Sequence, residues 1–184
     1  KSEFLEAYAL GDDLVVNALA DGLVLYDDGF LIPLLSQPLP KPSLAVAAQN
    51  LNEARKKIED ARRNYREGSL DTAIMLLRLA MSMAARGYLI LKGETPGSRH
   101  DLVFQLRKYS HANARLLENL SRAGDTAAHP ATTSRKEAVW SMLRQCEAFV
   151  RQALWESRGL RGWPASLSAD SLSRDGSCNP RGTT

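Results

Sequence analysis

The sequence predicts an all-α protein, an up-and-down bundle of four or five helices with a short N-terminal appendage and a flexible C-terminal tail. Apolar residues recur three or four positions apart through residues 44–65, 70–91 and 138–154, the spacing that puts them on one side of a helix. Short stretches of Gly, Ser, Pro and Asp separate these segments. Of the 184 residues, 44% are hydrophobic and 24% are charged, which is enough for one core.

Residues 1–42 have a pattern of their own, which we expect to form the appendage. Two short helices are predicted, one ending at Gly11 and one beginning at Asp12 or Asp13. The apolar residues 23–26 and 30–32 flank an Asp-Asp-Gly turn and predict a β-hairpin. Because a lone hairpin is marginally stable, it should pack on the bundle or pair with another chain.

Four prolines at residues 33–42 predict a stiff connector to the bundle. The first long helix should begin after Ser43 as its N-cap and end at Gly68. Its charged side mixes both signs, so we interpret it as a solvated face with i, i+4 ion pairs rather than a nucleic-acid surface. Gly68-Ser69 leaves almost no loop, so an antiparallel helical hairpin should follow.

The second long helix, residues 70–91, is apolar nearly all round and should lie at the centre of the bundle. Only Arg78, Ser82 and Arg86 form a polar line along it, at i, i+4 and i+8. This line fits a polar seam, a dimer contact or one side of a ligand cleft. The segment is long enough to span a membrane, but two arginines and a serine in line oppose that. We therefore expect a cytoplasmic protein with no membrane partner.

Three further helices are predicted: one starting at Ser98 or Asp101, one running through Leu120, and a last one opened by the capping box Ser134–Glu137. From about residue 158 the chain is rich in Gly, Ser, Pro, Arg and Asp, which predicts a flexible tail. Trp163 is its one candidate anchor. The expected domains are therefore 1–42, 43–157 and 158–184.

Composition limits the chemistry. The net charge of +3 permits an acidic partner without requiring one. Cys146 and Cys178 lie far apart in the sequence, one in a helical segment and one in the polar tail. They form neither a disulfide framework nor the spacing of a zinc site, which fits a reducing, intracellular setting. The three histidines have no metal-ligand spacing on one helix. We expect neither a metal nor a cofactor.

Arg122 and His129, in the stretch RAGDTAAH, are the candidate catalytic pair. An arginine offers a permanently charged fork that matches phosphate, and a histidine moves a proton near neutral pH. Together they could hold a scissile phosphate and act as acid or base on a ribose 2′-hydroxyl without a metal. The spacing alone favours structural roles for the two residues, as a surface arginine and a loop histidine, over a catalytic role.

The helical segments and their junctions resemble the HEPN domain, a prokaryotic module often encoded beside, or fused to, a minimal nucleotidyltransferase. The resemblance covers about residues 43–157. Residues 3–35 look like the end of a nucleotidyltransferase domain, although the Gly-Ser and paired aspartates that would hold magnesium are absent. The most telling parts are the junction Gly68-Ser69-Leu70-Asp71, the small-residue run at 80–85, and Pro96-Gly97 before His100-Asp101-Leu102.

The resemblance implies a role for the candidate pair. In many HEPN proteins an Arg, four to six residues and a His form a ribonuclease motif that is assembled across a dimer, and Arg122 and His129 match that spacing. Two positions differ from the pattern of the active forms. Ala123 stands where those forms commonly carry a polar residue after the arginine. Pro130-Ala131 follows the histidine here, whereas the toxin subgroup tends to have a tyrosine two residues after it.

Three functions fit these features of the sequence. The expected one is a homodimeric, non-catalytic HEPN module that binds a nucleotide, a nucleic acid such as RNA, or a partner nucleotidyltransferase. The first alternative is a metal-independent endoribonuclease of the toxin–antitoxin kind. The second is a purely structural dimerisation domain.

Overall fold

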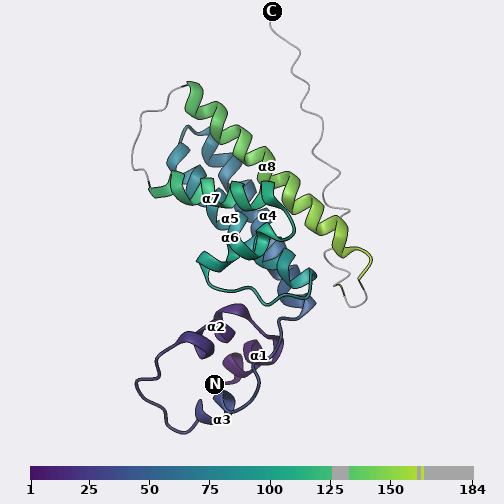
Figure 1. Ribbon diagram of the computed structural model, residues 1–184. Coiled ribbons are helices and arrows are strands. Elements are labelled where there is room, and N and C mark those ends of the chain that lie inside the picture. The colour runs from purple at the N-terminus through teal and green to yellow at the C-terminus, as the bar shows by residue number, and fades with distance from the viewer. Residues whose placement is uncertain (126–132, 161–162, 164–184) are drawn as a thin grey trace, which may run out of the picture.

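The computed structural model describes residues 1–125, 133–160 and 163, and every regular element in that range is a helix (Figure 1). Five of them form the bundle, which confirms the predicted fold class. The helices are α1 (Ser2–Leu10), α2 (Asp13–Asp21), α3 (Ile32–Leu35), α4 (Leu44–Arg66), α5 (Leu70–Leu91), α6 (Arg99–Arg107), α7 (His111–Asp125) and α8 (Thr133–Ser157).

The α4–α5 hairpin follows the sequence signals closely. Ser43 caps α4, its hydroxyl accepting a hydrogen bond from the amide of Val46 at 3.4 Å. Gly68 turns the chain in the left-handed region, at φ +83°, where glycine carries no steric penalty. Where the two helices pack, Gly87 faces α4 so closely that a Cβ there would lie 2.9 Å from Leu51 Cγ.

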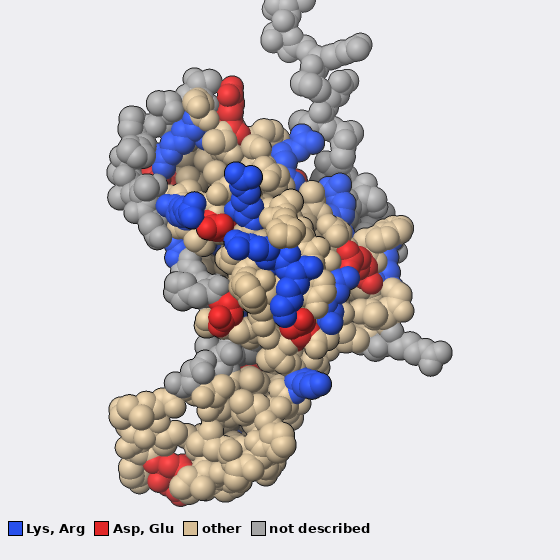
Figure 2. Space-filling view, in the orientation of Figure 1, with Lys and Arg blue, Asp and Glu red and all other residues tan. Residues whose placement is uncertain are grey.

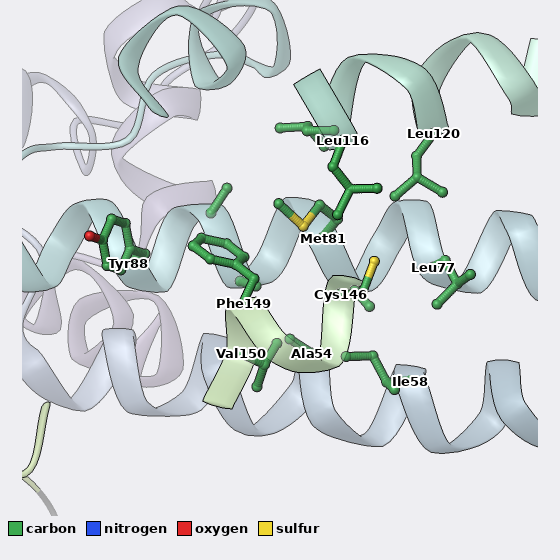
Figure 3. Packing of buried hydrophobic residues seen from close by; sticks show 14 of the residues in the cluster. Ala54, Ile58, Leu77, Met81, Tyr88, Leu116, Leu120, Cys146, Phe149 and Val150 are labelled. Carbon is green, nitrogen blue, oxygen red and sulfur yellow. The ribbon is translucent and has the colours of Figure 1, made fainter. Parts of the chain in front are cut away.

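The core is built around α5 (Figure 3). Helix α5 lies between α4 and α7, and α8 packs across the groove that α4 and α5 form. Phe149 of α8 is 1% exposed and meets the ring of Tyr88 edge-on at 5.3 Å. By length and composition α5 could cross a membrane; in this structure 56% of its most apolar window is buried by the other helices.

The shorter helices close the side of α5 that α4 leaves open. Ser98, one of the two predicted starting points, is the N-cap of α6, and its amide donates a hydrogen bond to the carboxylate of Asp101 at 3.1 Å. Leu102 and Leu106 of α6 and Leu120 of α7 are buried in the same cluster as α5.

The predicted hairpin in residues 1–42 is wrong. Residues 23–31 have no regular structure, and their side chains at 23, 25 and 26 are more than 80% exposed. The carboxylate of Asp27 instead accepts hydrogen bonds from the amides of Phe30, Leu31 and Ile32. Those amides would have been needed for a strand ladder, and no third strand is present in the described residues to stabilise one.

The connector and the last helix also differ from expectation in detail. The proline-rich segment opens with one turn of helix, α3, because Pro33 lies in its first turn, where a missing N–H costs nothing. Helix α8 begins at Thr133, one residue before the predicted cap.

Trp163 anchors the end of the described chain. It packs against Val46 and Ile90, where α4 begins and α5 ends, as the sequence predicted. Most of the predicted tail, residues 161–162 and 164–184, lies outside the described residues, so its flexibility stays a prediction.

Candidate functional site

Arg122 lies in the last turn of α7 with its side chain 75% exposed. One turn earlier, Glu118 accepts a hydrogen bond from its guanidinium at 2.8 Å. The other oxygen of that carboxylate lies 3.6 Å from the guanidinium of Arg107 on α6. Glu118 therefore sits between two arginines and leaves the three groups with one net positive charge.

This arrangement has a chemical consequence for phosphate binding. A phosphate that approaches Arg122 must compete with the carboxylate that already occupies its fork. Exposed ion pairs of this kind contribute little, about 0–1 kcal/mol, so a dianionic ligand can displace Glu118. The guanidinium of Arg122 therefore stays exposed at the end of the bundle and is not packed into the core.

His129, the partner assigned to Arg122, lies outside the described residues, in the segment 126–132 between α7 and α8. After this segment, Arg135 in the first turn of α8 forms an ion pair with Asp71 in the first turn of α5. Sequence reasoning missed this ion pair because its partners are 64 positions apart and neither has a recognisable motif.

Arg78, Ser82 and Arg86 lie along one side of α5 and are all partly buried. The hydroxyl of Ser82 donates to the carbonyl of Arg78 at 2.9 Å, so this side chain is satisfied within its own helix. Met75 and Leu79, 52% and 43% exposed, lie on the same side. The predicted polar line is thus part of a mixed apolar and basic strip at the surface, which we call the α5 strip.

The described residues contain no group of three or more His, Cys, Asp or Glu side chains that could hold a metal ion. His111 begins α7 and is exposed. Cys146 lies on the inner side of α8 and is fully buried, and burial raises the pKa of its thiol to about 12. At neutral pH that thiol stays protonated and is no nucleophile.

Charge is divided unevenly along the chain. Residues 1–42 carry seven Asp or Glu and two Lys or Arg, whereas residues 43–157 carry 12 and 18. Figure 2 shows the result in space: basic side chains gather on the visible face of the bundle, and the N-terminal region shows almost none. An anionic ligand is therefore attracted to the bundle and repelled by residues 1–42.

At the other end of α5 an ion pair joins two long helices. Lys92 Nζ lies 2.6 Å from Glu156 Oε2 on α8 and 5.0 Å from the ring centre of Tyr88. The hydrogen bond to Glu156 raises the pKa of Lys92, and the same bond lowers the pKa of Glu156. Both shifts favour the charged forms of the two residues, and the ion pair links the C-terminal end of α5 to α8.

Comparison with known proteins matches residues 47–154 to the HEPN domain. No curated protein matches the chain. The match does not reach residues 3–35, whose resemblance to a nucleotidyltransferase stays a prediction. The matched segment begins in the first turn of α4, contains α5, α6 and α7, and ends in the last turn of α8. Because the match covers more than half of the chain, this protein belongs to the HEPN domain family.

Proposed function

We propose that this chain is a non-catalytic HEPN module that binds an anionic ligand, a nucleotide or a nucleic acid, and works as a homodimer. The observation that carries the proposal is the excess of basic residues in the bundle, set against an acidic N-terminal region. Arg122 supports it, because within the described part of the chain its exposed guanidinium is held by a displaceable ion pair with Glu118.

The α5 strip supports the dimer. A surface with exposed Met75 and Leu79 beside Arg78 and Arg86 combines apolar area with positive charge. A nucleotidyltransferase is a second candidate partner, suggested by the resemblance of residues 3–35.

Thermal unfolding tests the proposal. A ligand that binds the folded chain at 100 times its Kd adds about 2.7 kcal/mol, so ATP, GTP or a short single-stranded RNA should raise Tm by roughly 5–10 °C. An Arg122→Ala variant should keep the ligand-free Tm and lose most of that increase. Equal melting of the parent with and without all three ligands would reject the binding function.

A metal-independent ribonuclease is the alternative, favoured by the exposed position of Arg122 and by the six residues that separate it from His129. In EDTA, labelled single-stranded RNA should then be cleaved by the parent and left intact by Arg122→Ala and His129→Ala. Activity that survives in either variant removes this assignment. Circular dichroism checks that both variants keep the parent's helix content.

A structural dimerisation domain is the third candidate. It predicts a stable dimer that binds none of these ligands. Light scattering at micromolar concentration distinguishes it, because a monomer would exclude both this function and a site shared between two copies.

A further inference from the structure

The outward side of α8 carries a regular row of basic and aromatic side chains. Exposed residues recur every three or four positions from residue 136 to residue 158, so they lie along one side of the helix. We call this row the α8 stripe. Its members are Lys136, Trp140, Arg144, Ala148, Arg151, Trp155 and Arg158.

Two tryptophans of the stripe lie open to solvent. Trp140 is 40% exposed and Trp155 is 68% exposed. Tyr65 of α4 stacks against Trp140 at 5.4 Å between ring centres, and the Arg158 guanidinium lies 4.9 Å from the ring centre of Trp155. Both indoles are therefore held by a neighbour and still offer aromatic surface to a ligand.

The charges around these rings are arranged to attract an anion. Among the described residues, Lys136, Arg144 and Arg151 have no ion-pair partner. Two acids of the same helix point to its flanks instead: Glu147 pairs with Arg62 of α4, and Glu156 pairs with Lys92. Glu137, at the N-terminal end, is the one exposed acid beside the stripe in the described part of α8.

Alternating cations and stacking surfaces suit one class of ligand. Single-stranded nucleic acid presents a phosphate at each step and an unpaired base whose flat surface stacks on aromatic rings. Trp140 and Trp155 are 15 residues apart, about 22 Å along the helix. At a stacked rise of 3.4 Å that distance spans roughly six nucleotides, within the range of known single-strand sites.

We propose that the α8 stripe binds single-stranded nucleic acid, with bases stacked on Trp140 and Trp155 and phosphates on Lys136, Arg144 and Arg151. The proposal rests on the nucleic-acid part of the proposed function and names the surface and the ligand. A duplex fits less well, because its bases are stacked on one another and closed to the two indoles. A second copy also fits less well, because a twofold contact would set these cations against themselves.

The experiment measures fluorescence anisotropy of a labelled, unstructured ten-nucleotide RNA titrated with the full chain. Trp155→Ala should weaken binding at least about fivefold, the low end for loss of one base stack. Trp155→Phe should restore much of that loss because it keeps a ring. The double variant Arg144→Glu with Arg151→Glu should weaken binding more and reduce the salt slope by about 0.7 for each phosphate that is no longer neutralised.

A matched control makes the same change in charge away from the stripe. Lys41→Glu with Lys56→Glu alters an exposed connector residue and an exposed residue of α4, and should bind RNA within about twofold of the parent. Circular dichroism and Tm establish that all variants are folded. A duplex of the same sequence should bind the parent more weakly than the single strand does.

The outcomes separate this proposal from the proposed function. RNA binding that is abolished in Arg122→Ala and unchanged in every stripe variant would overturn the α8 stripe and keep the proposed function. A parent that binds no RNA overturns the stripe and the nucleic-acid function together, and leaves a nucleotide as the ligand to be tested by melting. A dimer that dissociates in the Arg144→Glu with Arg151→Glu variant of such a parent identifies the stripe as a protein interface instead.

Discussion

The bundle and the N-terminal region use similar residues and reach different degrees of order. In the bundle, apolar side chains of α4, α5, α6, α7 and α8 share one buried cluster. In residues 1–42, Val16 is the buried hydrophobic residue among those described, and Leu23, Leu25 and Tyr26 are more than 80% exposed. The difference lies in what covers each segment rather than in its hydrophobicity.

Local hydrogen bonds hold the N-terminal region where packing does not. Asp12 caps α2 through the amide of Val15, and Asp27 gathers three amides ahead of α3. An edge contact between Phe4 and Phe30 at 5.7 Å joins α1 to the segment that precedes α3. Such contacts fix turns, but they bury too little apolar surface to make a second core. Four substitutions test this comparison.

Phe149→Ala should have the largest effect. Its ring is 1% exposed and packs on Tyr88, so truncation leaves a cavity and should lower the free energy of unfolding by about 3–5 kcal/mol. Phe104→Ala is the control, because Phe104 is 68% exposed and its loss should cost less than about 0.5 kcal/mol. Urea unfolding measures both, and equal losses would contradict a core centred on α5 and α8.

Gly87→Ala probes the close contact of α4 and α5. The added methyl would lie 2.9 Å from Leu51 Cγ and 3.0 Å from the carbonyl oxygen of Ala47. Overpacking of this kind costs about 1–3 kcal/mol, partly offset by the better helix propensity of alanine, about 1 kcal/mol, so a net loss of about 1 kcal/mol is expected. Gly159→Ala meets no atom within 4 Å and should leave Tm unchanged. A more stable Gly87→Ala variant would show that the helices can move apart freely.

Glu156→Gln should have a smaller, pH-dependent effect. The pKa of Glu156 is lowered in the folded chain by Lys92, so the pair stabilises the fold above the ordinary pKa near 4.5 and loses this contribution as pH falls below it. At pH 7 the variant should lose no more than about 1 kcal/mol. As the pH falls from 7 to below 4.5, the urea midpoints of parent and variant should move closer together, and a difference that stays constant with pH would argue against an ionic cause.

Asp27→Ala should have the smallest effect on the whole protein. It removes the acceptor for the amides of Phe30, Leu31 and Ile32, so those amides should exchange faster with deuterium. The unfolding midpoint of the bundle should not move, because the three hydrogen bonds that are lost lie within residues 27–32, outside the bundle. A shift of that midpoint would show that the two regions unfold together.

The helices of the bundle could be predicted from the sequence because each carries a local signal. Ser43, Gly68 and Gly93 mark the ends of α4 and α5, and the apolar spacing between them sets their sides. The surfaces that bear function were predicted less well. The sequence singled out Arg122 but not the carboxylate of Glu118 that holds it, and it found Arg78 but not its exposed neighbours Met75 and Leu79.

What the sequence by itself determined is the helix content, the hairpin of α4 and α5, and the HEPN family, because capping residues and apolar spacing act within one turn of the chain. Tertiary structure alone decided how the helices pack on one another, and so how much of each side chain beside the apolar stripes stays in water. Whether Trp140 and Trp155 of α8 lie in the core or outside depends on where α4 and α5 pack against that helix. The local pattern predicts which side of a helix is apolar, but the exposed fraction of a residue at the edge of that side depends on the distant segments that pack beside it.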